Sequence, residues 1–111
     1  MIYLGSGEDW AKGEGGADVI KGGGDGDTIF GDDPFVPAPT DGKDVLKGGG
    51  GPDNIHGGGK ADTIRGNANT FGTDGMFGDD GRDDLAGGSG VDSADGGNGL
   101  DVCVAETQVS C

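Results

Sequence analysis

Single apolar residues recur about every nine positions along this chain, and glycine-rich stretches separate them. Most lie in the middle of a short β-prone segment, such as Thr28-Ile29-Phe30 or Thr63-Ile64-Arg65. In a strand the middle side chain points to the face opposite its neighbours, so we expect flanking residues such as His56 to face water. The side chains expected to point inward are Ile2, Ala11, Ile20, Ile29, Leu46, Ile55, Ile64, Met76, Leu85, Ala94 and Cys103.

An aspartate lies two positions before each of these apolar residues except Ile2. The aspartates are nine residues apart, with two breaks of 17 and 12 residues, which are one period plus eight and one period plus three. A short period that continues in phase indicates a solenoid. The ten aspartates in phase are Asp9, Asp18, Asp27, Asp44, Asp53, Asp62, Asp74, Asp83, Asp92 and Asp101.

Each complete unit contains six glycine-rich residues that end in aspartate, followed by three β-prone residues. The clearest units are residues 22–30, 48–56, 57–65, 87–95 and 96–104. They match the nonapeptide G-G-x-G-x-D-x-U-x, where U is a large apolar residue, which is the calcium-binding repeat of RTX proteins. The chain therefore resembles the RTX, or hemolysin-type, calcium-binding repeat family over nearly everything from Ile2 to Val104.

This resemblance implies an all-β fold, namely a right-handed parallel β-roll, which is a β-solenoid of two short parallel sheets. Two repeats form one coil, so ten repeats predict about five coils and a column roughly 24 Å long at ~4.8 Å per strand. We assign residues 1–104 to the β-roll, with insertions at about 32–40 and 67–71, and residues 105–111 to a C-terminal cap. The single aliphatic row is too thin to stabilise the fold alone.

The composition is extreme, with 29 glycines among 111 residues and 21 acids against 7 Lys plus Arg. Such a chain usually remains disordered, and we expect disorder in the absence of calcium. The regular apolar residue in each period argues against disorder in the calcium-loaded state. A net charge of −14 argues against nucleic acid and anionic membranes as partners and favours cations. No apolar run approaches the ~18 residues of a membrane span.

Turns of equal parity stack on the same edge of a solenoid, so the aspartates form two columns. Calcium takes six to eight oxygen ligands from carboxylates and carbonyls, and glycine turns expose carbonyl groups. An ion between stacked turns satisfies both kinds of oxygen. The first column contains Asp9, Asp27, Asp53, Asp74 and Asp92. The second column contains Asp18, Asp44, Asp62, Asp83 and Asp101.

The resemblance also implies a ligand set for each ion. One turn supplies its aspartate and the carbonyls of its second and fourth residues, and the next stacked turn supplies its aspartate and the carbonyls of its first and third. Four gaps in each column allow up to about eight Ca²⁺, whose charge of +16 offsets the −14 of the chain. The four clearest sets are Gly5, Gly7 and Asp9 with Gly22, Gly24 and Asp27; Gly23, Asp25 and Asp27 with Gly48, Gly50 and Asp53; Gly58, Lys60 and Asp62 with Gly78, Asp80 and Asp83; and Asp79, Gly81 and Asp83 with Gly96, Asn98 and Asp101.

Two insertions interrupt the pattern. The first contains Pro34, Pro37 and Pro39, which cannot join a strand ladder, so we expect a surface excursion. It is either a neutral loop with Phe35 against the flank or a knob that binds a partner. The turns before Asp44 and Asp74 lack the Gly-Gly start, so calcium sites that use these two aspartates are expected to be weaker.

Cys103 takes an inward position in the last repeat, and Cys111 ends the chain. The end of a solenoid exposes strand edges and core and needs a cap. We expect the tail to fold over that end and a Cys103–Cys111 disulfide to hold it, as two cysteines in an extracellular module favour a bridge. The alternative is two free thiols. The pair without further Cys or His is a poor zinc site.

These features predict a calcium-binding structural module of a secreted bacterial protein that folds on binding Ca²⁺. Ile2 takes the apolar position of a repeat that would start before Met1, so we expect a longer parent chain, whose protein partner the sequence does not identify. Alternatives are an adhesion or partner-binding module that acts through Phe35 and Phe71, and a non-catalytic appendage of a secreted enzyme. We expect no enzyme activity, because His56 is the only histidine. Ice binding requires a regular outward row of threonines, which this chain lacks.

Overall fold

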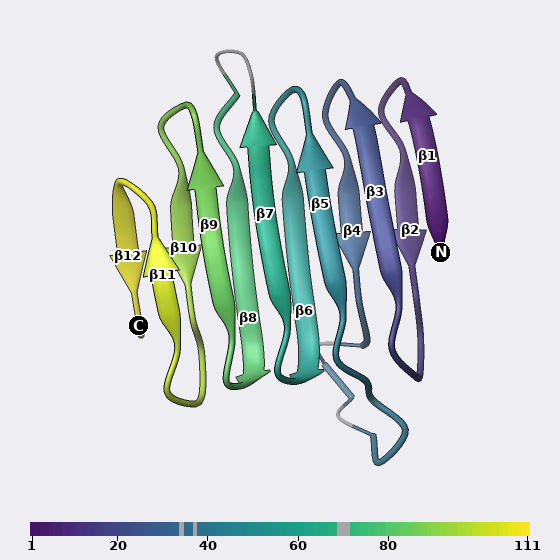
Figure 1. Ribbon diagram of the computed structural model, residues 1–111, viewed down its shortest axis with the longest axis vertical. Helices are drawn as coiled ribbons and strands as arrows, with labels where there is room; N and C mark the ends of the chain where they lie inside the picture. The colour runs from purple at the N-terminus through teal and green to yellow at the C-terminus, as the bar shows by residue number, and fades with distance from the viewer. Residues whose placement is uncertain (34, 37, 69–71) are drawn as a thin grey trace.

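The computed structural model describes residues 1–33, 35–36, 38–68 and 72–111, and it is a flattened coil of short parallel strands (Figure 1). The described residues form twelve strands in two six-stranded sheets and contain no helix. One sheet has the order β1 (Ile2–Ser6), β3 (Val19–Gly24), β5 (Val45–Gly49), β7 (Thr63–Ala68), β9 (Asp84–Gly88) and β11 (Val102–Val104). The other has the order β2 (Trp10–Lys12), β4 (Thr28–Phe30), β6 (Asn54–Lys60), β8 (Gly75–Gly81), β10 (Ser93–Asp95) and β12 (Thr107–Val109).

Successive strands alternate between the two sheets, so two strands and two turns make each coil. The expected all-β solenoid of two parallel sheets is confirmed. The described strands make about six coils rather than about five, because the count of ten aspartate repeats omits β1 and β12. No helix in the described residues has the length and apolar character of a membrane-crossing segment.

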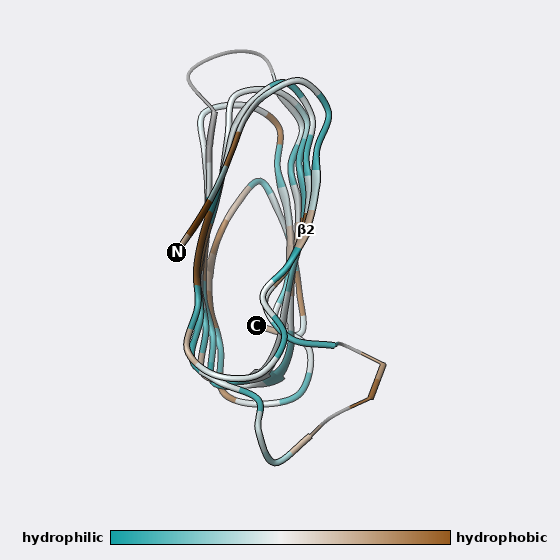
Figure 2. Ribbon diagram, turned by 90° about the vertical axis from the view of Figure 1, so that its right-hand side faces the viewer, coloured by the Kyte–Doolittle hydropathy of each residue, from teal (hydrophilic) through white to brown (hydrophobic). Residues whose placement is uncertain are grey.

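The core is a single row of inward side chains along each sheet, as the apolar period predicts. Ile2 pairs with Ile20, Ile20 with Leu46, and Leu46 with Ile64 along the first sheet. From Ala11 to Ala94 the row is at most 6% exposed, while Ile2 and Cys103 pack against it at the two ends. Seen along the stack in Figure 2, the coils largely superimpose, with the two sheets facing each other.

The outer face of one sheet is more covered around His56 than the sequence pattern suggests. The outward-pointing His56 stacks between Phe30 and Phe77, with ring centroids 5.1 and 4.5 Å away, and 17% of its side chain is exposed. The expectation that His56 faces open water is therefore wrong. Residues at the same place in successive coils stand one above another, so aromatic side chains there stack along the sheet.

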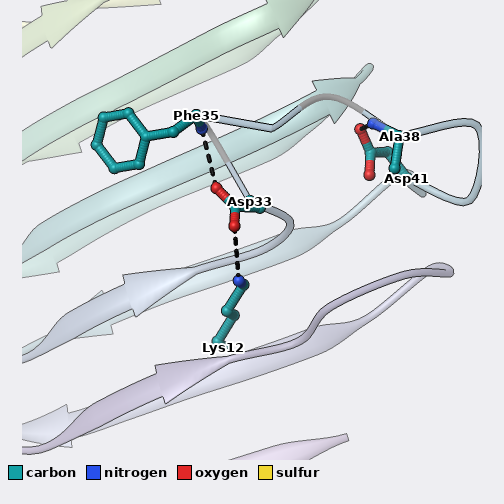
Figure 3. Close-up of polar contacts among 5 residues, drawn as sticks. All are labelled: Lys12, Asp33, Phe35, Ala38 and Asp41. Carbon is teal, nitrogen blue, oxygen red and sulfur yellow. Dashed lines mark hydrogen bonds and ion pairs between the residues drawn. The ribbon is translucent and has the colours of Figure 1, made fainter.

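The first insertion leaves the coil after β4 and projects from its edge (Figure 2). Asp33 holds its base by accepting hydrogen bonds from Lys12 Nζ and from the backbone N–H of Phe35, each at 3.0 Å (Figure 3). The chain re-enters near Asp41, whose carboxylate accepts the N–H of Ala38 at 2.7 Å. Pro34 and Pro37 of this insertion, and Phe71 of the second, lie outside the described residues.

The C-terminal tail adds one more strand at the end of the coil, beside β10. Residues 107–109 form β12, which pairs with β10 in parallel and in phase, with Ser93 opposite Thr107. Cys103, in the other sheet, forms a disulfide with Cys111 just beyond β12, and the Cα atoms are 5.8 Å apart. This bond connects the two sheets at the last coil.

Replacing both cysteines by serine is expected to weaken the protein without preventing folding. A disulfide that closes a loop of this length stabilises by about 2–3 kcal/mol in the chain-entropy model, because it restricts the unfolded chain. Urea unfolding at saturating calcium, followed by circular dichroism, measures the difference. An unchanged midpoint, or a double variant that never folds, would contradict this expectation; reduced wild-type protein is the matched control.

Candidate metal centre

The aspartates in phase form two continuous ladders of hydrogen bonds. In each ladder the Oδ1 atom of one aspartate accepts the backbone N–H of the aspartate in the preceding stacked turn. The N···O distances are 2.9–3.0 Å from Asp9 to Asp92 in the first column. They are 2.8 Å from Asp18 to Asp101 in the second column. The structure therefore stacks the ten aspartates in the two columns that their parity predicts.

The second oxygen of every one of these carboxylates is left over. Among the described residues, the Oδ2 atoms of all ten aspartates are buried and have no hydrogen-bond partner. A buried carboxylate oxygen without a partner costs several kcal/mol unless an opposite charge neutralises it. One such atom at every turn is a strong indication that a cation belongs in the columns.

A backbone carbonyl lies beside the free carboxylate oxygen in most turns. A Cβ added to Gly22, the first residue of its repeat, would meet both Asp27 Oδ2 and the carbonyl oxygen of Gly48 in the next stacked turn. A carboxylate oxygen and a carbonyl oxygen therefore converge on the side of the glycine where a side chain would lie. The same pair of oxygens converges at Gly31, Gly57, Gly66 and Gly78.

The turn backbone has positive φ at fixed positions, a regularity that the sequence pattern did not reveal. In eight turns the second and fourth residues of the repeat have positive φ, a conformation that favours glycine. Four of these positions carry a side chain nevertheless, and they are Glu14, Asp25, Lys60 and Asp79, with φ from 69 to 81°. The shared conformation, rather than glycine as such, defines the turn.

The structure stacks the turns of all four expected ligand sets. Gly5 lies opposite Gly23, Gly23 opposite Gly49, and Gly58 opposite Asp79. Asp80 and Asn98 form a parallel bridge in the last set. Some expected ligand carbonyls also accept ladder bonds, such as Gly23 O from the N–H of Gly50 at 2.8 Å. A carbonyl oxygen has a second lone pair, so this use does not prevent metal binding.

The donor set fits calcium better than a transition metal. In the described part of the chain, no three His, Cys, Asp or Glu side chains are grouped so that they could hold a metal ion. Each gap instead brings carboxylates together with turn carbonyls, and such hard oxygen donors are the ligands that Ca²⁺ prefers. Zinc would require histidine or thiolate, and both cysteines are in the disulfide.

Burial makes the aspartates reluctant to carry charge without a cation. Burial is the largest cause in each case, the hydrogen bond from the preceding aspartate N–H opposes it, and the charges of stacked aspartates add to it. These effects raise the pKa of Asp44 to about 6, of Asp53 and Asp83 to about 7, and of Asp62 to about 8. These four carboxyl groups therefore favour a proton or a bound cation near neutral pH.

The tail supplies two groups that sequence reasoning missed. Glu106 Oε2 accepts the N–H of Asp92 at 2.9 Å and so takes the place of an aspartate at the end of the first column. Near Gly96, the carbonyl oxygen of Ser110 converges with Asp101 Oδ2, where the other turns use a glycine carbonyl. The signal in the sequence was the acid two positions before Gln108, but glutamate and glutamine both depart from the repeat.

Asp44 and Asp74 keep their places in the ladders despite the insertions. They are 1% and 0% exposed, and their Oδ2 atoms converge with the carbonyls of Gly57 and Gly87. Whether calcium binds there more weakly remains a prediction. Each insertion lies between the first glycine and the aspartate of its turn. The two ends of the turn still stack on the neighbouring coil.

Comparison with known proteins agrees with this geometry. The model of the RTX calcium-binding nonapeptide repeat (4 copies) matches residues 3–33, 40–70 and 71–107. No curated protein and no solved structure matches the chain. Because the family model covers most of the sequence, the chain belongs to the RTX calcium-binding nonapeptide repeat family, whose repeats are calcium-binding β-roll modules.

Gly22→Ala is expected to remove calcium binding at one turn, because the new Cβ would occupy the space of Asp27 Oδ2 and the Gly48 carbonyl. Gly24→Ala in the same turn is the matched control, since a Cβ there meets nothing within 4 Å. Isothermal titration with calcium should show a loss of about one ion for Gly22→Ala and none for Gly24→Ala. Equal behaviour of the two variants would contradict the proposed position of the ion.

The calcium-free chain is expected to gain β structure as the pH falls from 8 to 5. The folded-state pKa values of Asp53 and Asp62 lie above the ordinary value of 3.8, so the stability of the metal-free fold is greatest at low pH. It is lost as the pH rises through about 7 and 8. Far-UV circular dichroism on calcium-free protein measures the change, and a spectrum independent of pH would refute the expectation. Calcium affinity should fall as the pH falls, because protons compete with the ion for the carboxylates.

Proposed function

We propose that this chain is a calcium-dependent folding module of a secreted bacterial protein, disordered at low calcium and rigid at high calcium. The observation that carries the proposal is the set of ten buried Oδ2 atoms without hydrogen-bond partners, one in each repeat. Its role is structural, because the described part of the site offers oxygen ligands for a cation. Calcium ions are its primary partners.

The charge of the chain supports this mechanism. Fourteen net negative charges are concentrated in a small fold, and aspartates in the same column repel one another across ~5 Å. Calcium ions between stacked turns would neutralise these aspartates, and up to eight ions would bring the net charge from −14 to +2. Metal binding then supplies the free energy that the thin aliphatic row does not.

The two carboxylate oxygens of an aspartate have different roles. In eight of the ten aspartates Oδ1 accepts an N–H from the preceding stacked turn and fixes the carboxylate in place, as between Asp27 and Asp53. Each Oδ2 remains free for the ion, together with carbonyls such as Gly48 O. A bound Ca²⁺ would therefore link neighbouring coils along the axis, and it supplies only charge and coordination.

Secretion and a larger parent protein belong to the same proposal. A Cys103–Cys111 disulfide persists in oxidising compartments, where calcium is also abundant. His56 is held by two aromatic rings and by Asp79, whose Oδ2 lies 3.1 Å from Nδ1. A nucleophile is not among these contacts, so any catalytic activity is assigned to other parts of a parent chain.

A second candidate function is the binding of a protein partner through the first insertion. Phe35 is 83% exposed and Trp10 63%, and both line a shallow apolar pocket with Phe30. The Asp33–Lys12 ion pair holds the base of this insertion (Figure 3). Capture of a specific partner by wild-type protein, lost in Phe35→Ala with unchanged calcium-dependent folding, would favour this function.

Removal of calcium is expected to unfold the module, because the uncompensated aspartate columns outweigh the thin core. Circular dichroism during a calcium titration of chelator-treated protein should show disordered chain becoming β structure cooperatively. Magnesium is the control and should not substitute, since it requires tight octahedral geometry and retains its waters. A β spectrum and melting temperature unaffected by EDTA would refute the proposed function.

A further inference from the structure

The turn that contains the first insertion, residues 31–44, is built differently from its neighbours. Asp32 is the second residue of this turn, and Gly42 takes the fourth position when Asp44 is counted as the sixth. Neither residue has the positive φ found at these positions in eight other turns. The backbone conformation associated with the nonapeptide is therefore absent from this turn. The side chain of Asp32 lies where the eight turns with positive φ have glycine or a less buried side chain.

Asp32 is a buried carboxylate with one oxygen fixed and the other unused. The residue is 0% exposed. Its Oδ2 atom accepts the backbone N–H of Gly42 at 2.9 Å, which joins the two ends of the turn across the insertion. Its Oδ1 atom is buried and has no hydrogen-bond partner. Asp32 is not one of the ten aspartates in phase, so the repeat pattern does not account for this free oxygen.

The position of Asp32 brings it to the calcium cradle of Asp44. Its backbone N–H donates to the carbonyl of Gly57 at 3.0 Å. This carbonyl also converges with Asp44 Oδ2 beside Gly31. The Cβ of Asp32 lies against Gly58, where an added Cβ would be 2.6 Å away. Asp32 therefore faces the stacked turn of residues 57–62, across the gap in which the Asp44 cradle opens.

The charges around this gap also favour a cation. Burial raises the pKa of Asp32, the backbone N–H groups of Gly42 and Gly59 oppose this rise, and the negative charges of Asp41 and Asp18 add to it. Asp32 in turn contributes to the raised pKa of Asp44, for which burial is the largest cause. A buried carboxylate that keeps one oxygen without a partner, among other carboxylates, favours a proton or a cation. The free Oδ1 of Asp32 would add a hard oxygen ligand of the kind that Ca²⁺ prefers.

We propose that Asp32 Oδ1 is a calcium ligand outside the nonapeptide scheme, and that it completes the site between the insertion turn and residues 57–62 with Asp44 Oδ2 and the Gly57 carbonyl. The inference rests on the proposed calcium function and extends it to a residue that the repeat does not specify. Side chains alone do not form a cage in the described residues, so the backbone carbonyl is part of the site. The additional carboxylate strengthens calcium binding at a turn whose regular backbone conformation the insertion has altered.

The test compares Asp32→Asn with Asp33→Asn in isothermal titrations of calcium into calcium-free protein. The asparagine oxygen at position 32 still accepts the Gly42 N–H, so the variant removes charge and retains shape. Asp33 is adjacent, pairs with Lys12 on the surface and lies outside the columns, which makes it the matched control. Asp32→Asn should lose one calcium ion or weaken one site at least tenfold, and Asp33→Asn should bind calcium as the wild type does.

A second measurement separates a ligand from a structural hydrogen bond. Thermal melts are recorded for wild type and Asp32→Asn at saturating calcium and in calcium-free buffer at pH 5. A ligand role predicts a lower melting temperature only with calcium, since the neutral side chain removes repulsion when no ion is bound. Equal destabilisation in both buffers, or calcium binding identical to wild type, would overturn the assignment. Wild-type protein that binds no calcium would instead refute the proposed function itself.

Discussion

The structure depends on how a buried carboxylate at every turn is neutralised. In eight of the ten aspartates one carboxylate oxygen accepts a backbone N–H from the preceding coil, and in all ten the other oxygen has no hydrogen-bond partner among the described residues. The first interaction fixes the stacking of the turns, and the second makes that stacking costly without a cation. Aspartate therefore specifies the stacking of the turns and also destabilises it. A bound cation would remove the destabilisation and leave the stacking in place.

The distribution of apolar surface explains why the ion has such influence. Each strand contributes essentially one inward side chain, and a strand pairs only with the strand one coil earlier and one coil later. Solenoid stability is a sum of such nearest-neighbour contacts, so no central core compensates for a weak coil. A calcium ion bound between turns would act at the same coil-to-coil contact, which is where a solenoid gains stability.

The sequence predicted the inward row and the two aspartate columns, because both follow from period and parity alone. Ile55 and Asp53 have the expected neighbours despite two insertions in the chain. Other features depend on geometry that the period does not encode. Glu106 continues a column with a longer side chain, and Lys60 adopts a positive φ that its residue type disfavours. The stacking of His56 arises from neighbours one coil away, which lie 26 and 21 positions distant in the sequence.

The two insertions show that the register of the stack depends on the number of turns and not on the number of residues in each turn. Asp44 follows Asp18 by 26 positions and Asp62 follows Asp44 by 18, yet both pairs make the same 2.8 Å contact. The length of chain in a turn is therefore free to drift, provided that its first glycine and its aspartate still meet the neighbouring coil. Natural variation can add loops at the edges of such a scaffold without shifting the frame of the remainder. The edges are thus the part of the molecule where new surfaces can arise while the calcium columns persist.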